Sequence, residues 1–466
     1  MNSKLFHGIL CLIGGVLLQL FLGCCFLYGN IQVYITSYLN KQHPTVSLND
    51  TLFASPANTI FQAIGNPLGM ILLRYFHPRI VIIIGCSIAI GGILAASFMT
   101  HVVPFVLLYG WAYGLGIGIA YIVVLVTGWQ HFPERKGMVT GFVIGAFGFG
   151  AFIFGYVSLE VANPENASPQ YGVSGGKIFY PDQIQSDRAP KMIRINALIW
   201  TWMSVIGIIL IGKPSQDKED LQTLTFSDDS DTFSQTDIAN NVSLIETNKE
   251  KNEVKQFIPF NVAIKEFATW HLWIMMVVWS VQGSFLNYVY KSYGGLNISD
   301  DRFLTIVGTT ASVLNSASRV FWANMQDKFG FKPMYTGLLI IQITVGFTIE
   351  LISSSKPLYM IWVCLQYAWV GGYYSLTPTV CGKMYGHKTG GSIFSILMLW
   401  FIPAGLASLW LSRFLYKPLG YGAIFYITAG MSVVSFIMLL FFKEKEYLVK
   451  DPSLLDSSKK GYESSL

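Results

Sequence analysis

One stretch of the chain joins two apolar runs and reads Asn324-Met-Gln-Asp327-Lys328-Phe-Gly330-Phe-Lys332-Pro333. A looser counterpart follows an apolar run nearer the N-terminus, where Gly65-Asn-Pro-Leu-Gly69 leads into Leu73-Arg74-Tyr-Phe-His-Pro-Arg79. Each join places charged residues and a turn between runs that are long enough to cross a bilayer as helices. Two such joins at equivalent places indicate two similar sets of membrane helices.

The composition supports this interpretation and excludes most others. Of the 466 residues, 52% are hydrophobic and only 12% are charged, with a mean hydropathy of +0.48. Soluble domains are about a quarter charged. The chain is therefore predicted to be an all-α polytopic membrane protein, which excludes a soluble enzyme, a secreted domain and a nucleic-acid binder. The formal charge of +5 is accordingly not a nucleic-acid signal.

Apolar windows predict twelve transmembrane helices in two six-helix halves. The spans are 8–34, 53–73, 79–99, 103–127, 137–158, 192–212, 268–290, 303–323, 332–352, 357–380, 389–412 and 421–442. The predicted halves are residues 1–212 and 257–442, followed by a cytoplasmic tail, 443–466. Between the halves, residues 213–256 hold ten acids and five lysines. A segment with this charge and so few aromatic residues cannot bury enough surface to fold, so it is predicted to be a disordered cytoplasmic linker.

Basic residues in the short loops set the orientation. They fall on one side of the predicted membrane, and are Arg74, Arg79, Arg135, Lys136, Lys328, Lys332, Lys383, Lys388, Lys443 and Lys445. That side is predicted to be cytoplasmic, with both termini on it. Three glycosylation sequons, at Asn49, Asn166 and Asn297, then fall in outer loops, whereas a fourth at Asn241 lies in the linker and is expected to be unmodified.

Arg319 stands out because a charge inside hydrocarbon is costly unless it faces a cavity or a partner. It lies eight residues before Asp327, which places it about 12 Å inside the cytoplasmic boundary. A fixed guanidinium at this depth suits a carboxylate. The alternative is that Arg319 reaches the interface or pairs with helix carbonyls. Asn315, one turn earlier, is placed to bind substrate or to orient Arg319.

The middle of the predicted spans holds no Asp, Glu or His. A proton symporter would therefore lack an obvious titrating group, and exchange or facilitated diffusion fits better. Glycines recur every four residues in two helices and predict close helix contacts. These stripes are Gly110, Gly114 and Gly118, and Gly137, Gly141 and Gly145.

Polar aromatic residues suggest the walls of a cavity, with an interfacial belt as the alternative. We predict that Tyr28, Tyr121, Trp369 and Tyr373 line the substrate site, together with Asn30.

The two loop motifs resemble the G-x-L-x-D-x-x-G-x-K/R signature of the major facilitator superfamily, the second closely and the first in degenerate form. The stretch from Gly128-Trp129 through Phe132-Pro133-Glu134-Arg135-Lys136-Gly137 to Gly141 resembles the W-F-P-x-R-x-G-x-x-x-G signature of its oxalate–formate antiporter and monocarboxylate transporter families. Asn315-Ser-Ala-Ser-Arg319 resembles their helix-8 arginine segment. The likeness covers both halves but neither the linker nor the tails.

This resemblance implies that Arg319 binds a carboxylate. Two departures from the pattern of these families restrict the class of substrate. The oxalate carriers have a lysine in helix 11, and the span 389–412 contains none. The proton-linked monocarboxylate carriers have an acid four residues before the arginine and a lysine in helix 1, whereas here Asn315 and an uncharged helix stand in those places.

We therefore predict a secondary transporter of a small organic anion, expected to be a monocarboxylate, that works by alternating access through exchange or uniport. The alternatives are a carrier of neutral or zwitterionic solutes such as amino acids, or a membrane sensor. Conformational gating is assigned to Gly69, Arg74, Arg79, Arg135, Gly137, Asp327, Lys328 and Gly330. No cofactor, metal, catalytic residue or nucleic acid is expected. The predicted partners are the anion and the bilayer; the protein is expected to be a monomer with room for an accessory subunit, in the plasma membrane by default.

Overall fold

The computed structural model describes residues 3–51, 53–165, 167, 170–171, 177–178, 184–212, 257–298 and 300–448. In the first part of the chain these form α1 (Ser3–Leu22), the 3₁₀ helix η1 (Gly23–Leu27), α2 (Tyr28–Gln42), α3 (Leu48–Thr51), α4 (Ala54–Tyr75), α5 (Pro78–Ala96), α6 (Val102–Val106), the π-helix η2 (Leu107–Ala112), α7 (Tyr113–His131), η3 (Pro133–Arg135), α8 (Lys136–Ala162) and α9 (Gln185–Leu210). A two-stranded antiparallel sheet, β1 (Gln170–Tyr171) and β2 (Lys177–Ile178), precedes α9.

The second part of the chain is also helical. It forms α12 (Phe260–Ala263), α13 (Phe267–Asn297), α14 (Asp301–Phe329), α15 (Phe331–Ile352), α16 (Lys356–Leu397), η4 (Met398–Trp400), α17 (Phe401–Trp410), the π-helix η5 (Leu411–Leu415) and α18 (Tyr416–Phe441).

Each of the twelve predicted spans coincides with a helical stretch, although several helices are longer or interrupted. The first span changes from α-helix to 3₁₀ helix at η1 and back to α-helix in α2. The tenth and eleventh are joined in α16, where Gly386 adopts a φ of 76° and turns the chain. Among the described residues, eight stretches are long and apolar enough to cross a membrane, and one of them, Lys356–Ser408, contains the tenth predicted span and most of the eleventh.

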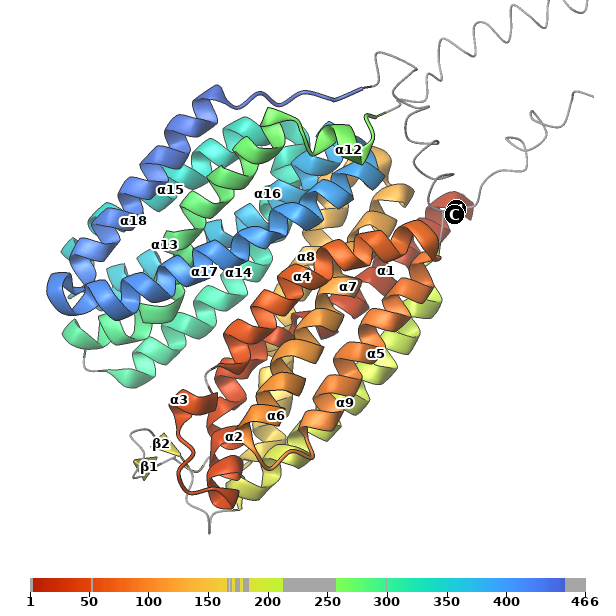
Figure 1. Cartoon of the computed structure of the whole chain (residues 1–466). Helices are drawn as coiled ribbons and strands as arrows, with labels where there is room; N and C mark the ends of the chain where they lie inside the picture. Colours follow the sequence, from red (N-terminus) through yellow and green to blue (C-terminus); the bar gives the residue numbers. More distant parts are fainter. Residues whose placement is uncertain are drawn as a thin grey trace, which may run out of the picture.

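The helices pack as two groups that lie side by side (Figure 1). We call α1–α9 with their short helices the first half, and α12–α18 the second half. In the first half, α7 packs against α4 and α5, and α1 packs against α8 and α9. In the second half, α14 packs against α16, and α15 against α18. The largest contact between the halves joins α8 to α14, and α16 also meets α4 and α8.

The two predicted glycine stripes have different places in this arrangement. Gly114 and Gly118 of α7 lie against the backbone of α4, so this stripe packs one half internally. Gly137 and Gly141 of α8 lie against α14, where a Cβ on Gly141 would come within 3.0 Å of Val320 Cα. The predicted close contacts are confirmed, and only the α8 stripe lies between the halves.

Part of the predicted C-terminal tail is packed against the second half. The Tyr447 amide donates to the Met384 carbonyl at 2.8 Å, and the Ile258 amide donates to the Tyr447 carbonyl at 3.1 Å. Phe257 and Leu448 form an antiparallel bridge beside these bonds. Residues 443–448 therefore close over the turn at Gly386, a contact between distant segments that local hydropathy does not indicate.

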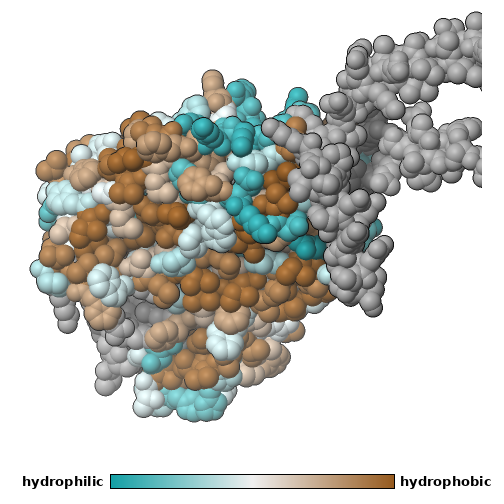
Figure 2. Space-filling view, turned by 45° about the horizontal axis from the view of Figure 1, so that its top comes forward, coloured by the Kyte–Doolittle hydropathy of each residue, from teal (hydrophilic) through white to brown (hydrophobic). Residues whose placement is uncertain are grey.

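The outer surface fits a bilayer. Figure 2 shows apolar side chains over most of the middle of the visible face, with hydrophilic side chains toward its upper right margin and its bottom. Large exposed apolar residues occur on nearly every long helix, among them Ile83, Trp202, Ile340 and Phe441. Exposing such a surface to water is unfavourable, whereas contact with lipid tails is not.

Several predictions fall outside the described residues, namely the linker 213–256, Asn166, Asn241 and residues 449–466. Asn49 lies in α3. Asn297 ends α13, is exposed, and donates through Nδ2 to Ser353 Oγ at 2.9 Å. Glycosylation at these positions stays a prediction.

Candidate functional site

Arg319 lies in the middle of the contact between the two halves. Its side chain belongs to α14 and is 3% exposed. Nη1 donates to the Ile144 carbonyl of α8 at 3.0 Å, and Nη2 donates to Asn315 Oδ1 at 2.9 Å. Nε is buried and has no hydrogen-bond partner. The guanidinium therefore stays at this depth and joins the two halves.

The neighbours of Arg319 hold the guanidinium without neutralising it. Asn315 Nδ2 donates to the Tyr367 carbonyl of α16 at 2.7 Å, which fixes the amide that accepts from Arg319. The Tyr374 ring lies 5.0 Å from the guanidinium carbon. From the first half, Cys25 and Tyr121 lie within electrostatic range. Among the described residues, the contacts of Arg319 are with a carbonyl, an amide and a ring, and include no carboxylate.

Tyr374 is a residue that sequence reasoning missed. The sequence predicts Trp369 and Tyr373, which share a helix face, but neighbouring residues of a helix point about 100° apart. The face that meets Arg319 is the one carrying Tyr374. Its ring also stacks on Phe401, which connects the arginine to α17. The pattern of aromatic residues alone does not choose between Tyr373 and Tyr374.

Trp369 and Tyr373 lie inside the second half. The Tyr373 ring stacks on Trp279 at 3.7 Å between centroids, and its hydroxyl donates to Gln342 Oε1 at 3.2 Å. Trp369 packs edge-on against both rings. These contacts link α13, α15 and α16, so the described contacts do not bring either side chain to Arg319.

Tyr28 packs within the first half. Its hydroxyl donates to the Thr51 carbonyl at 2.7 Å, and its ring lies 5.0 Å from that of Tyr109. Tyr121, by contrast, is buried near Arg319 and packs edge-on against Phe147 of α8. Of the predicted binding residues, the structure brings together Arg319, Asn315 and Tyr121.

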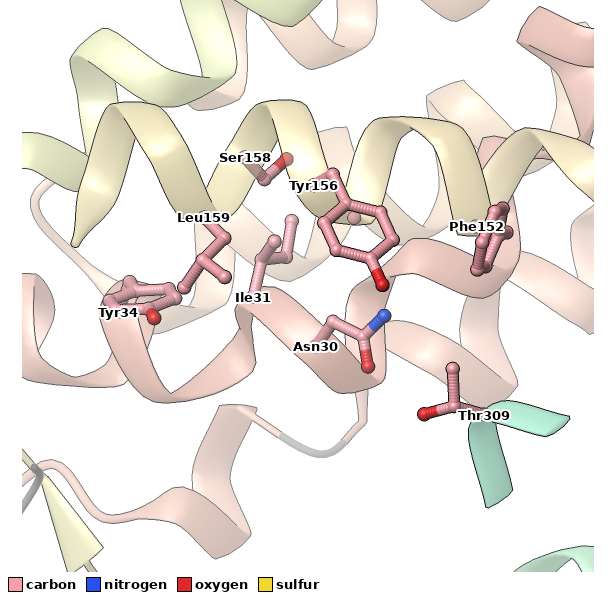
Figure 3. Close-up of a pocket in the computed structure, with 9 residues that line it drawn as sticks. Asn30, Ile31, Tyr34, Phe152, Tyr156, Ser158, Leu159 and Thr309 are labelled. Carbon is pink, nitrogen blue, oxygen red and sulfur yellow. The ribbon is translucent and has the colours of Figure 1, made fainter. Parts of the chain in front are cut away.

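Asn30 lines a cavity of about 220 Å³ between the halves (Figure 3). The cavity is bounded by α2, α8 and α14, and its lining residues are Asn30, Ile31, Tyr34, Phe152, Gly155, Tyr156, Ser158, Leu159 and Thr309. Thr309 belongs to the second half and the others to the first. Figure 3 shows the Asn30 amide directed toward the Tyr156 hydroxyl, with Thr309 across the cavity.

At the opposite end of the α8–α14 contact, Asp327 closes the gap between the halves. Its Oδ1 accepts from the Gly137 amide at 3.2 Å and its Oδ2 from the Met138 amide at 3.0 Å. These amides begin α8, where backbone donors lack helical partners and the helix dipole favours an anion. Lys383 Nζ lies 3.0 Å from Asp327 Oδ1.

A second contact at this end also crosses between the halves. Lys136 Nζ donates to the Gly382 carbonyl of α16 at 2.8 Å. A Cβ on Gly137 would overlap the Ala323 carbonyl oxygen and the Asp327 carboxylate, so only glycine permits this approach. Neither Lys136 nor Lys383 was singled out as a gating residue, because their partners are distant in sequence.

The other predicted gating residues lie mostly within one half. Gly69 packs against the Ile119 backbone, and Arg79 donates to the Ile209 and Ile211 carbonyls at the end of α9. Gly330, with a φ of 83°, ends α14. Arg74 does reach the other half, with its guanidinium carbon 5.3 Å from the Phe260 ring. Arg135 and Lys328 are exposed.

The described residues contain no group of three or more His, Cys, Asp or Glu side chains that could hold a metal ion.

Comparisons with known proteins agree on the type of molecule. Residues 270–460 match the model of the Major Facilitator Superfamily. The chain is 22% identical over 450 residues to apicoplast pyruvate carrier 1 of Toxoplasma gondii, covering 84% of this chain and 80% of that protein. It is also 22% identical over 420 residues to the oxalate:formate antiporter of Oxalobacter formigenes, covering 90% and 88%.

A solved structure shares the fold. The proton:xylose symporter XylE superposes with a TM-score of 0.63 at 16% identity, covering 96% of this chain and 98% of that one. The resemblance to the major facilitator superfamily is confirmed by these matches, as is the predicted all-α polytopic membrane fold. The molecule is a transporter and not an enzyme.

Proposed function

We propose that this secondary transporter with the major facilitator fold carries a small monocarboxylate, which Arg319 binds as its carboxylate. The observation that carries the proposal is the charge balance at Arg319. The guanidinium is buried, Nε has no partner, and the described contacts supply only neutral groups. Leaving one member of a buried ion pair alone costs about 3–5 kcal/mol, so an anion at this place is strongly favoured.

The charge expected of the substrate follows from the single positive charge of Arg319. A dianion would bring a second negative charge, and the described contacts around Arg319 include no second cation. The names of the relatives support a small carboxylate as substrate, since one is named as a pyruvate carrier and the other as an oxalate:formate antiporter. One guanidinium matches one carboxylate, which favours the monoanions.

We infer alternating access between the two halves, residues 1–212 and 257–442. The structure is closed at the end that holds Asp327 and has a cavity at the other end. Arg319 lies between them and contacts both halves. Movement of α8 against α14 would break the Asp327 contacts and narrow the cavity, which exchanges access from one side to the other.

Exchange or uniport, without proton coupling, is the proposed mode. The described surroundings of Arg319 include Asn315, Tyr121, Tyr374 and Cys25 but no Asp, Glu or His. None of these is a proton carrier whose ordinary pKa lies near neutrality.

The basic loops support cytoplasmic termini, and a monomer is sufficient because one chain contains both halves. The protein is an integral multi-pass membrane protein. Its membrane is a separate proposal: the default is the plasma membrane, but two relatives are named as apicoplast pyruvate carriers, which makes the apicoplast the alternative. A fluorescent fusion examined in the native cell would decide between these.

The test is counterflow of labelled formate, acetate, lactate, pyruvate and oxalate, with an amino acid as the neutral alternative, in proteoliposomes. We expect a monocarboxylate to accumulate and Arg319→Gln to reduce its uptake by at least 100-fold. Arg194→Gln is the matched control, because Arg194 also makes hydrogen bonds and a ring contact, with Ser97 and Phe98, but away from the site. Its uptake should stay within twofold of the native rate.

A pH gradient imposed across the same vesicles tests the coupling. Uptake that is independent of the gradient supports exchange or uniport, whereas uptake that follows it would show a proton site. Transport of only neutral solutes, or native uptake by Arg319→Gln, would overturn the carboxylate assignment.

A further inference from the structure

The cavity at Asn30 is bordered by the same three chain segments that lie around Arg319, at positions further from the Asp327 end. On α14, Thr309 lies ten residues before Arg319, which is about 15 Å along the helix. On α8, Tyr156 lies twelve residues beyond Ile144, the residue whose carbonyl accepts from Arg319. On α2, Asn30 lies five residues beyond Cys25, which is within electrostatic range of the guanidinium. The same three chain segments thus border both places at different depths.

The lining of this cavity is polar but uncharged. None of its nine residues is an acid or a base. Asn30 is exposed, and Tyr156 is 57% exposed, so the amide and the phenol can both donate to a ligand. Ile31, Phe152 and Leu159 supply an apolar wall. The cavity therefore offers hydrogen-bond donors for a carboxylate beside a surface for a short carbon chain.

Gly155 keeps the polar side of the cavity open. A Cβ at this position would lie 3.3 Å from Asn30 Nδ2, tighter than an ordinary contact. The volume of about 220 Å³ is below the range of about 300–1,000 Å³ for pockets that take drug-sized ligands. Both features suit a molecule of a few heavy atoms.

Resting on the function proposed above, we propose that this cavity is an entry subsite for the transported monocarboxylate, in which Asn30 and Tyr156 donate hydrogen bonds to the anion before it reaches Arg319. Neutral donors hold a carboxylate less firmly than a guanidinium does, because only one partner of each bond is charged. Binding here is therefore weak and reversible, as a step toward a stronger site requires. The positive charge at Arg319 draws the anion inward.

Thr309 makes the subsite depend on conformation. It is the one lining residue from the second half, so movement of α14 toward α2 and α8 would remove the space. The anion is then either passed inward or released. The subsite belongs to the conformation in which the Asp327 end is closed.

The experiment separates binding in the cavity from binding at Arg319. Leu159 lines the cavity and is 37% exposed, and the six native cysteines are buried. Leu159→Cys in nanodiscs is labelled with a maleimide, and the pyruvate concentration that halves the labelling rate is measured. We expect pyruvate to protect this cysteine even when Arg319→Gln is also present.

Adding Asn30→Ala and Tyr156→Phe to that protein should raise the half-protective concentration at least tenfold. The matched control replaces an asparagine and a tyrosine elsewhere, Asn261→Ala and Tyr75→Phe, both exposed and outside the cavity. It should leave protection unchanged. Leu351→Cys, whose parent side chain is 78% exposed outside the cavity, should be labelled at a rate that pyruvate does not alter.

Protection that vanishes with Arg319→Gln, or that persists after both cavity substitutions, would overturn the entry subsite. With Arg319 intact, the two cavity substitutions should lower the ratio of maximal rate to KM for pyruvate about tenfold in both directions, as detailed balance requires, without abolishing uptake. An unchanged ratio would also count against it. These failures leave the Arg319 assignment standing, whereas native uptake by Arg319→Gln would remove the assignment itself.

Discussion

The two ends of the contact between α8 and α14 are built differently. At one end Asp327 accepts from the amides of Gly137 and Met138, and the glycine lets the two backbones approach. At the other end Tyr156 and Thr309 stand on opposite sides of a cavity. One pair of helices therefore carries a closed contact and an open one.

The acids of the ion pairs at the two ends differ in what else they bind. At the cavity end the pairs join elements of a single half, as in Lys41–Asp187, Arg188–Glu165 and Lys356–Asp300. At the closed end, the acid of the Lys383–Asp327 pair also binds the opposite half. All four ion pairs, Lys383–Asp327 included, join elements of one half and fix that half as a unit. The bonds that fix the halves to each other at the closed end are those from the α8 amides to Asp327 and from Lys136 to Gly382, and these must break during transport.

Between the two ends of this contact, the largest effect is expected from the glycine at the closed end. In Gly137→Ala the added methyl would overlap the Ala323 carbonyl and the Asp327 carboxylate, so this end could no longer close. Because the rest of each half is unaffected, we expect exchange to fall at least tenfold while the melting temperature changes by only a few degrees. The purified variant is compared with the native protein in its exchange rate in proteoliposomes and in its melting temperature.

Two other glycines sharpen this prediction. Gly114→Ala would press on the α4 backbone inside one half, so it should lower the melting temperature, with a cost of about 1–3 kcal/mol for overpacking. Gly91→Ala has open space around its Cβ, so it should lower neither the exchange rate nor the melting temperature. If Gly137→Ala and Gly114→Ala behaved alike, the distinction between the two stripes would be lost.

A smaller effect is expected from the charge at the closed end. Asp327→Asn leaves one acceptor in place of two and removes the ion pair with Lys383. Hydrogen bonds to charged groups contribute about 1.5–3 kcal/mol. The asparagine amide keeps one neutral hydrogen bond, so only part of this free energy is lost. We expect a three- to tenfold fall in exchange, measured as above.

Arg74→Gln tests the other join of the repeat. Arg74 lies three residues before His77, which caps α5, as Asp327 lies three residues before Gly330, which precedes α15. The join after α14 carries the acid Asp327, and the join after α4 carries the base Arg74. Arg74 contacts the opposite half through the Phe260 ring. An exposed contact of this kind contributes about 0.5–1 kcal/mol, so exchange should stay within twofold. Equal losses for Arg74→Gln and Asp327→Asn would mean that the two joins act alike.

The smallest effect is expected at the cavity end. The hydrogen bond from Arg188 lowers the pKa of Glu165 below its ordinary value. The stabilisation from this pair is present above that ordinary value and is lost as the pH falls through the lowered pKa. Glu165→Gln should leave exchange unchanged and slightly reduce the loss of thermal stability between pH 7 and pH 3, as measured by melting temperature. A change in exchange would show that this ion pair is not confined to one half.

The sequence by itself determined where the helices lie and which charge is exceptional. The cost of placing a residue in hydrocarbon adds up along a local window, so hydropathy locates the spans whatever their partners are. For the same reason Arg319 stands out, since a buried charge is costly in any arrangement. The stripe from Gly137 to Gly145 likewise predicts a close contact, because it needs only the repeat of one helix.

The tertiary structure decided what each side chain meets. Tyr373 and Tyr374 are adjacent, and only the packing of α16 against α14 shows that the second lies over Arg319. The bond from Lys136 to Gly382 and the packing of residues 443–448 on α16 join segments far apart in sequence. Such contacts depend on how whole helices are arranged, which no local window of the sequence contains. The cavity at Asn30 depends on the same arrangement, because its walls come from both halves.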